Sequence, residues 1–395
     1  MSYSPLPETV ATPQTATMSN RERLLTIMDG GQPDRIPWIP RLQIWHTAHQ
    51  RQGSLPARFA DRSLRQIERE LGMGTPARDG QIFTIDERGD VEIETRSEGH
   101  SDITTYRTPA GTVSTRHQRS DELERLGIQS LEVEHMIKGP NDFAAVEYMV
   151  QNAYYEPTPK TYIDYEAEIG EDGYPLVAAG DCPFHHFLQK MTGYQQGYYI
   201  LNDYPREVQH LLETMEAIDR ERLWPVVAES PARLILHGLH FDSLMTPPPL
   251  FDRYITPYYR DFSALLHQRD KKLCMHADND SRLILHHLQE AGFDMVETFT
   301  TWPQVSCTLA EARQTWGKRM IIWGAVPSVI LEPVYPDDEF EAYMRQVFRT
   351  IAPGDALILG VADNIMPGAL LERLERIAEM VAEWGNYPID ADHIG

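Results

Sequence analysis

Four residues that can bind a cation follow short apolar runs in the second half of the chain. His276 and Asp278 come after "KKLCM". Glu297 follows "DMV", and Asp363 follows "ALILGVA". An imidazole and several carboxylates that meet away from water must bind a cation or share protons, because like charges do not stay ionised unpaired. Such nitrogen and oxygen donors suit Zn²⁺, and also Mn²⁺ or Fe²⁺. We therefore predict that these four residues form a metal site.

The stretch "HADND", residues 276–280, also has a second interpretation. Asp278 or Asp280 would be the N-cap of a helix that begins near Ser281, and would accept hydrogen bonds from its first amides. The cap and the metal site are compatible, and the sequence leaves both open.

Two further polar stretches follow apolar runs. "HGLHFDSL" places His240 and Asp242 after "ARLIL". A carboxylate at Asp242 can orient a substrate hydroxyl or act as a general acid or base, and its alternative role is a cap before "PPPLFDRY". "GDCPFHHFLQKMTGY" places His185 and His186 after "PLVAAG", as part of a substrate wall or as a proton donor. The alternative there is a helix entry with Asp181 as its cap. We predict His240, Asp242 and His185 as catalytic residues.

The elements that must position these residues alternate between short apolar runs and helical patterns. The strand candidates are "RIPWIP", "PLVAAG", "ARLILHG", "KKLCMH", "DMVET", "MIIWG" and "ALILG". Helical patterns such as "PREVQHLLETMEAIDRERLWPVVAES" separate most of them. This alternation indicates a parallel sheet covered on both faces. At 395 residues, without a GxGxxG or P-loop motif, it favours a (β/α)₈ barrel over an open doubly wound sheet. The candidate residues would then share the rim at the carboxyl ends of the strands.

The remaining segments suggest a simple domain organisation. Residues 1–19 are predicted to be a mobile tail, and residues 20–395 a single barrel domain. The helix "NRERLLTIMDG" would begin at Asn20 as N-cap and stop at Gly30. Between about 82 and 118, alternation and turn residues predict two or three antiparallel strands as a small insertion near the N-terminus.

Composition excludes several classes of protein. The formal charge of -23 argues against nucleic acid or an anionic membrane as a partner, since both attract positive patches. The three cysteines form no CxxC pair, so neither a disulfide framework nor a cysteine-rich zinc site is expected. The chain starts without a secretory signal, and no apolar run approaches the length of a membrane span. A cytoplasmic protein is therefore predicted.

Several motifs together resemble the uroporphyrinogen decarboxylase superfamily, in particular its corrinoid-dependent methyltransferase branch. They are "RERLLTIMDGGQPDRIPW", "YRTPAGTV", "EHMIKGPNDF", "LMTPPPLFDRYITPYYRDF", "KKLCMHADND", "LQEAGFDMVET" and "LILGVADNIMPGALLERL". The resemblance covers the chain from about Asn20 to Pro388. It implies a (β/α)₈ barrel and, in the zinc methyltransferases of this fold, a His-x-Cys motif, a glutamate and a later cysteine.

This sequence departs from that ligand pattern at its sulfur positions. Asp278 and Asp363 stand where such relatives carry cysteine, beside His276 and Glu297. Oxygen ligands leave a harder Lewis acid than thiolates do. Thiol methylation therefore becomes less favoured, and polarisation of an ether or phenol oxygen more favoured.

The decarboxylase itself is the competitor within the superfamily. Its N-terminal loop is arginine-rich because its substrate carries many carboxylates. Here the stretch is "PRLQIWHTAHQRQGSLP", which keeps Arg41 but introduces Trp45 and His46. Such a pocket suits a mostly apolar aromatic substrate. We predict Arg41, Trp45, His46 and His186 as substrate-binding residues, with a place in the core as the alternative for Trp45.

The function predicted from the sequence is a metal-dependent methyltransferase. It would move a methyl group from a methoxylated, aromatic substrate to the cobalt of a corrinoid (cobalamin) on a separate protein, because the chain lacks a "DxHxxG" loop. Zinc or another divalent metal is the expected cofactor, and a homodimer is a family expectation. The alternatives are a decarboxylase, a thiol or tetrahydrofolate methyltransferase of the same fold, and a noncatalytic binding protein.

Overall fold

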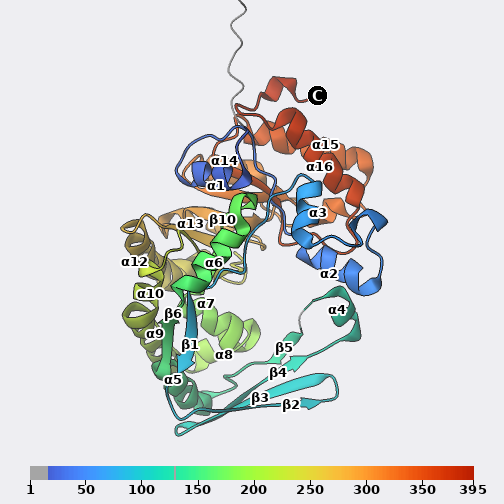
Figure 1. Ribbon diagram of the computed structural model, residues 1–395. Coiled ribbons are helices and arrows are strands. Elements are labelled where there is room, and N and C mark those ends of the chain that lie inside the picture. Colours follow the sequence, from blue (N-terminus) through green and yellow to red (C-terminus); the bar gives the residue numbers. More distant parts are fainter. Residues whose placement is uncertain (1–16, 129) are drawn as a thin grey trace, which may run out of the picture.

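A six-stranded parallel sheet forms the centre of the computed structural model, which describes residues 17–128 and 130–395 (Figure 1). Each strand pairs with the next one along the chain. The strands are β7 (Val177–Gly180), β8 (Leu234–Leu239), β9 (Lys272–His276), β10 (Met295–Phe299), β11 (Ile321–Val326) and β12 (Leu357–Val361). The prediction of a parallel α/β sheet is confirmed, and these six strands coincide with six of the apolar runs.

The seventh run, "RIPWIP", does not form a regular strand. Only Trp38 makes a parallel bridge, to Leu359 of β12. Pro37 and Pro40 flank this position and lack the N–H that a strand ladder requires.

A second irregular segment lies beside Trp38. Gly74 N–H donates to the Trp38 carbonyl at 2.8 Å, and Leu176 N–H donates to the Ala77 carbonyl at 3.0 Å, one residue before β7. Backbone hydrogen bonds thus run from β12 through Trp38 and residues 74–77 to the start of β7.

Helices follow the strands and cover the sheet (Figure 1). Those between β7 and β9 are α7 (Pro183–His186), α8 (Tyr194–Asp203), α9 (Pro205–Ile218), α10 (Trp224–Glu229), α11 (Pro248–Leu250) and α12 (Thr256–His267). Those after β9 are α13 (Leu285–Glu290), α14 (Leu309–Trp316), α15 (Asp337–Ile351) and α16 (Leu371–Trp384). None of the described helices is long and apolar enough to cross a membrane.

Both faces of the parallel sheet are buried. Leu236, Cys274 and Met295 pack together on one face, in a cluster that Trp323 and Ile358 join. The alternate residues of the same strands pack into a larger cluster with the helices. Such two-sided burial explains why these strands are continuously apolar in sequence.

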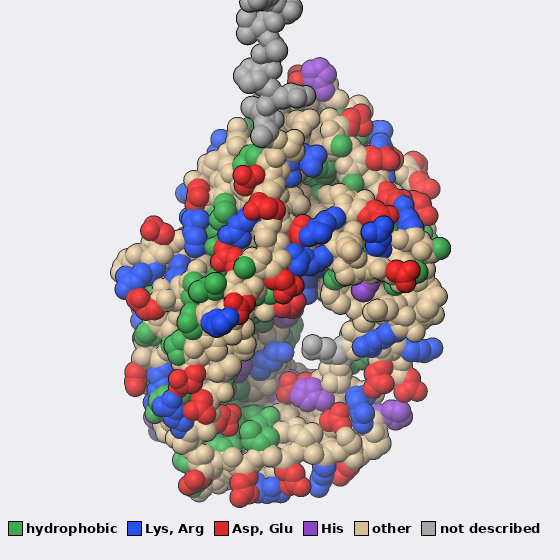
Figure 2. Space-filling model, viewed as in Figure 1, with side chains coloured by type: hydrophobic (Ala, Val, Ile, Leu, Met, Phe, Trp, Pro, Cys, Tyr) green, Lys and Arg blue, Asp and Glu red, His purple; other side chains and the backbone are tan. Residues whose placement is uncertain are grey.

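An antiparallel sheet lies apart from the parallel one, at the bottom of Figure 1. In the region predicted to hold antiparallel strands, it contains β2 (Glu92–Glu98), β3 (Ser101–Thr108) and β4 (Gly111–Gln118), joined by β5 (Leu131–Glu134). A separate ribbon pairs β1 (Phe83–Glu87) with β6 (Ala153–Pro157). Figure 2 shows this face of the molecule hollowed between the antiparallel sheet and the helices above it.

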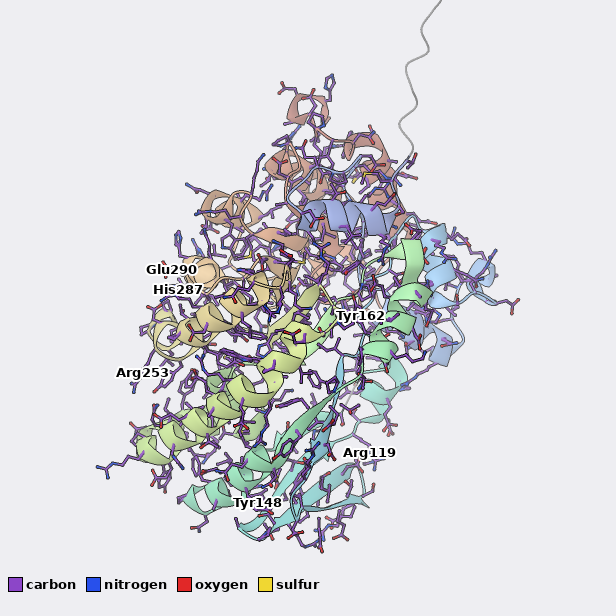
Figure 3. The ribbon with its side chains drawn as sticks, turned by 60° about the vertical axis from the view of Figure 1, so that its left-hand side comes forward. Arg119, Tyr148, Tyr162, Arg253, His287 and Glu290 are labelled. Atoms are coloured by element: carbon purple, nitrogen blue, oxygen red, sulfur yellow. The ribbon has the colours of Figure 1, made fainter. Side chains whose placement is uncertain are left out.

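Further helices precede β7 in the chain. They are α1 (Asn20–Met28), α2 (Gln43–Gln52), α3 (Leu64–Glu70), α4 (Asp121–Leu126), α5 (Phe143–Asn152) and α6 (Pro159–Ile169). The predicted cap of α1 is wrong by one residue: Ser19 is the N-cap, because its hydroxyl accepts from Glu22 N while Glu22 reaches back to Ser19 N. In Figure 3, Arg119 and Tyr148 lie around the antiparallel sheet, whereas Arg253, His287 and Glu290 lie on the outer helices.

Candidate functional site

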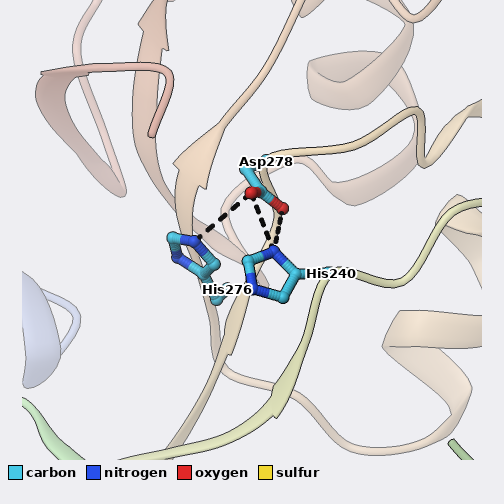
Figure 4. Close-up of side chains that lie close together, drawn as sticks. All are labelled: His240, His276 and Asp278. Carbon is cyan, nitrogen blue, oxygen red and sulfur yellow. Dashed lines mark hydrogen bonds and ion pairs between the residues drawn. The ribbon is translucent and has the colours of Figure 1, made fainter. Parts of the chain in front are cut away.

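Three side chains that can share a cation meet at the carboxyl ends of β8 and β9 (Figure 4). His240 follows β8, His276 ends β9, and Asp278 lies two residues further on. Their ligand atoms all lie within 4.8 Å of one another. His240 Nδ1 is 2.7 Å from Asp278 Oδ1, and His276 Nε2 is 3.6 Å from Asp278 Oδ2. We call His240, His276 and Asp278 the cation cluster.

Glu297 lies beside this cluster but faces the other nitrogen of His276. The two residues are register partners on β9 and β10, and His276 Nδ1 donates to Glu297 Oε2 at 2.6 Å. Glu297 Oε1 forms an ion pair with Arg78, and Thr298 Oγ1 lies 2.9 Å from His276 Nδ1. Both carboxylate oxygens of Glu297 are therefore engaged within the chain, and His276 Nε2 is left to face the cluster.

Asp363 lies near the Nε2 atom of His276, on the other side of the ring from Glu297. Its Oδ1 lies 3.6 Å from His276 Nε2 and 2.6 Å from Arg41 Nη1. The structure thus brings all four residues predicted as metal ligands together, and it adds His240, which the sequence suggested only as a catalytic residue.

Neighbouring charges and hydrogen bonds shift the pKa values of the ionisable residues at this site. Burial disfavours the charged form of His276, but the charges of Glu297 and Asp278 and the hydrogen bond to Glu297 outweigh it and raise the His276 pKa to about 9. Burial also opposes ionisation of Asp278, yet its hydrogen bond to His240 and the charge of His276 3.6 Å away hold its pKa far below the usual range. Arg78 and His276 do the same for the pKa of Glu297 against its own burial. The site therefore favours a positive charge at its centre.

Several residues at this site, or next to it in the chain, have positive φ angles, which are unusual for residues other than glycine. His240, Thr298 and Asp363 have positive φ angles of 61°, 56° and 53°, and Ala77, next to Arg78, has 47°. Such angles cost about 1–3 kcal/mol each for residues other than glycine and persist where the surroundings enforce them. His240 N–H, for example, donates to the His276 carbonyl at 3.0 Å. Their gathering at one rim is typical of a functional site.

In the stretch "HADND", one aspartate is a cap and the other faces the cation cluster. Asp280 accepts from Arg282 N at 3.0 Å and from Ser306 N at 3.1 Å, so it caps the turn that precedes α13. Asp278 instead points to the cation cluster. The cap and the cation site are therefore built by different residues of the same loop.

Asp242 holds its own loop together. Its Oδ1 accepts from Leu244 N at 2.8 Å and Met245 N at 3.0 Å, within the turn that precedes α11. The predicted cap before "PPPLFDRY" is wrong, because Pro247 is the N-cap of α11 and no side chain caps that helix. The Oδ2 atom makes no hydrogen bond within the described residues.

The aromatic residues of α2 are buried. Trp45 is 2% exposed and donates through Nε1 to the Ala369 carbonyl, which places it in the core. His46 is 8% exposed, and burial lowers its pKa. Its Nε2 has no hydrogen-bond partner within the described chain. Of the predicted substrate contacts from this stretch, Arg41 lies nearest to the cation cluster, through Asp363.

His185 and His186 have different surroundings. His185 is fully buried, with Nδ1 2.6 Å from Asp181 Oδ2 and Nε2 2.7 Å from Tyr194 Oη. His186 lies between two apolar cavities of about 370 and 270 Å³, and burial lowers its pKa. His237, on β8, is fully buried with Nδ1 3.0 Å from Tyr259 Oη.

A larger cavity of about 600 Å³ is bordered by the two arginines that pair with Asp363 and Glu297, and no residue of the cation cluster lines it. Arg41 and Arg78, which pair with Asp363 and Glu297, line it together with Leu42, Pro76, Ala77 and Tyr165. Its size suits a ring-sized small molecule.

Three residues of this region were not predicted from the sequence. Arg78 belongs to the irregular segment "GTPARDG", Thr298 lies inside a strand, and Tyr194 begins α8. The rule that polar residues follow apolar strands does not apply to Arg78 or Tyr194, because no apolar run precedes them.

Comparison with known proteins gives two kinds of match. A family model described as "Uroporphyrinogen decarboxylase (URO-D)" matches residues 161–384, more than half of the chain. A methyltransferase from Methanosarcina mazei shares the fold, with a TM-score of 0.50 and 14% identity over 93% of this chain and 99% of that chain. A protein from Listeria monocytogenes assigned as a vitamin-B12 independent methionine synthase gives a TM-score of 0.36. It shares 11% identity over 89% of this chain and 95% of that chain. No curated protein matches the chain significantly.

Proposed function

Because the chain belongs to the uroporphyrinogen decarboxylase family, as its motifs indicated, we propose that it is a metal-dependent methyltransferase. It takes a methyl group from a methoxylated aromatic substrate and passes it to the cobalt(I) of a corrinoid on a separate protein. The fold that it shares with the Methanosarcina mazei methyltransferase supports transfer of a methyl group.

The observation that carries this proposal is the donor set of the cation cluster. His240, His276 and Asp278 offer two imidazoles and one carboxylate, and no cysteine belongs to the group. Such donors suit Zn²⁺, Mn²⁺ or Fe²⁺. When bound, the metal supplies a Lewis acid that polarises an ether oxygen. Nitrogen and oxygen donors favour this chemistry over activation of a thiol.

The surrounding residues fit a divalent ion. His276 Nε2 makes no close hydrogen bond, since Asp278 and Asp363 both lie 3.6 Å from it. Glu297 holds the opposite side of the ring, as a carboxylate does for many metal-binding histidines. We infer that His240, His276 and Asp278 hold the metal, that Asp363 is its fourth neighbour, and that Glu297 orients His276.

The arginines near the site favour an apolar substrate over a polyanion. Arg41 is paired with Asp363, and Arg78 is paired with Glu297. Cations that are already neutralised by the chain attract several substrate carboxylates poorly. This argues for a methoxylated ring in the cavity of about 600 Å³, and against a decarboxylase that binds a polycarboxylate.

The proposal includes the closed architecture and the partner expected from the sequence. The hydrogen bonds from β12 through Trp38 and residues 74–77 to the start of β7 support a closed (β/α)₈ barrel with the cation cluster at its mouth. The hollow between this mouth and the antiparallel sheet gives a corrinoid protein room to approach (Figure 2).

Two measurements test the proposal. Metal analysis of the purified protein should find a divalent transition metal that the His276→Ala variant has lost. Added cob(I)alamin should then be consumed in the presence of methoxybenzenes, as followed by its absorbance, and the demethylated phenol should form in equal amount. A metal-free wild type, or cob(I)alamin left unchanged by every methoxylated compound, would contradict the proposed function.

A further inference from the structure

A cavity of about 370 Å³ lies at the carboxyl end of β7, and no residue of the cation cluster lines it. Ala178 and Gly180 of β7 line this cavity, and they are the only exposed residues in the six described strands of the parallel sheet. The other walls come from β1, β6, α5, α7 and α9. The sheet is therefore open at this place, with room for a small molecule.

Two of the three π-helical turns in the described chain border this cavity. One turn (Phe187–Met191) follows α7 and contributes Met191, and the other (Asp219–Leu223) follows α9 and begins with Asp219, which lines the cavity. π-Helical turns are rare and are found frequently at functional sites. Their position here indicates a site at which the side chain of Asp219 takes part.

Asp219 has one carboxylate oxygen without a partner. Its Oδ2 accepts from Tyr258 Oη at 2.8 Å, and Tyr258 Oη accepts in turn from Trp224 Nε1 at 3.0 Å. Its Oδ1 makes no hydrogen bond within the described residues. Burial raises the Asp219 pKa from 3.8 to about 7. Two buried aromatic residues thus fix one oxygen of this carboxylate, and the other oxygen is left for a ligand.

No cationic side chain pairs with Asp219 in the part of the chain that the structure describes. Arg220, the next residue, pairs instead with Glu216 at 2.6 Å, and Arg222 donates to backbone carbonyls. The lining of the cavity includes two acids, Asp181 and Asp219, but no lysine or arginine. An ionised Asp219 therefore lacks the counter-charge that a buried carboxylate requires.

The remaining wall is mostly apolar, and it suits the body of an organic cation. Phe83 packs edge-on against Tyr155, with 5.2 Å between the ring centroids, and such rings attract cations at their faces. Met191 and Met215 add flexible side chains that adapt to the shape of a ligand. Burial lowers the pKa of His186, which favours a neutral imidazole with one nitrogen that can accept a hydrogen bond.

We propose that this cavity binds a small organic ammonium ion, with the nitrogen at Asp219 Oδ1 and the apolar body against Tyr155 and Phe83. The ammonium group donates to the free carboxylate oxygen and supplies the missing counter-charge. A neutral alcohol of the same shape also donates a hydrogen bond, but it leaves the carboxylate uncompensated. This site is separate from the cation cluster and does not depend on the methyltransferase proposed above.

The probe is benzylamine, and benzyl alcohol is the uncharged compound of similar shape. Calorimetric titration at pH 8, above the Asp219 pKa of about 7, keeps this carboxylate ionised. Benzylamine should bind to the wild type at least about 10-fold more tightly than benzyl alcohol. Asp219→Asn should weaken benzylamine binding about 10–100-fold and change the binding of benzyl alcohol less than about 3-fold, because only the charge is removed.

Two control variants locate the binding. Glu216→Gln removes one negative charge from the preceding turn of α9, and Glu216 does not line the cavity. Asp278→Asn removes one charge from the cation cluster. Both should bind benzylamine as the wild type does. Urea unfolding should find Asp219→Asn at least as stable as the wild type at pH 8, since a buried charge is gone, so that lost binding does not reflect lost folding.

Three results would overturn the proposal. The first is a wild type that binds no benzylamine, or binds benzyl alcohol equally well. The second is an equal loss in Asp219→Asn and Glu216→Gln, which would reveal a general effect of charge. The third is full binding in Asp219→Asn with a loss in Asp278→Asn, which would place the amine at the cation cluster.

Discussion

Glu297 accepts the Nδ1–H of His276 at 2.6 Å across the paired strands β9 and β10, and this contact decides which nitrogen of His276 faces the cation cluster. The sequence placed Glu297 among the metal ligands. Its geometry favours a different role, in which the carboxylate orients the ligand and strengthens its basicity.

Glu297→Gln should weaken metal binding about 10–100-fold without abolishing it, because the side chain still accepts the His276 hydrogen bond but loses its charge. The measurement is competition for the metal with a chelator of known affinity. A loss as complete as that of His276→Ala would show instead that Glu297 binds the metal directly.

His240→Ala should lower metal content as strongly as His276→Ala, because both imidazoles belong to the cation cluster. His267→Ala is the matched control, since His267 also pairs with an aspartate, Asp294, at 2.8 Å but takes no part in the cluster. Metal analysis of the three purified variants decides the point. Full metal content in His240→Ala would restrict the site to the four residues predicted from the sequence.

The fold was more predictable than the site. Six buried strands can be recognised in the sequence as continuous apolar runs, because both of their faces are covered. The rule for carboxyl ends of parallel strands then located His276, Asp278, Glu297 and Asp363. Which atoms face one another depends on register, backbone angles and tautomers, and no local pattern encodes these.

The residues that the sequence missed come from irregular segments. Arg78 follows Ala77, whose φ of 47° places it outside strand geometry, and Tyr194 begins a helix after a turn at Gly193. The pairing of Arg78 with Glu297 and of Tyr194 with His185 spans distant parts of the chain. Such contacts follow from the tertiary fold alone.

Glu68→Gln should remove a pH dependence of stability. Glu68 is 2% exposed, and its side chain bonds only to Thr75 Oγ1 among the residues that the structure describes. Burial raises its pKa from 4.5 to about 7. The folded state therefore binds the proton more tightly than the unfolded chain, and stability is lost as the pH rises from about 4.5 to 7. At pH 8 the variant should be about 2–3 kcal/mol more stable than the wild type. Urea unfolding at several pH values measures this, with the exposed Glu70→Gln as control.

Gly324→Ala should destabilise the fold more than Gly317→Ala. Both glycines have positive φ, 149° and 56°, but a Cβ at Gly324 would overlap the backbone of Phe299, whereas one at Gly317 meets nothing within 4 Å. We expect a loss of about 1 kcal/mol at Gly317 and more than about 3 kcal/mol at Gly324. Thermal and urea unfolding provide the comparison. Equal losses would mean that backbone strain alone decides both.

Arg78 and Glu297 should be coupled in stability, because they form an ion pair in which the carboxylate is buried and the guanidinium is partly buried. Glu297 is fully buried, and Arg78 is its only cationic partner besides His276 among the described residues. Arg78→Ala leaves that carboxylate with less compensation and should cost about 3–5 kcal/mol. The double variant Arg78→Ala/Glu297→Ala should cost less than the sum of the two single variants, since no charge is then stranded. Urea unfolding of all four proteins gives the coupling free energy, and strict additivity would show that the pair does not interact energetically.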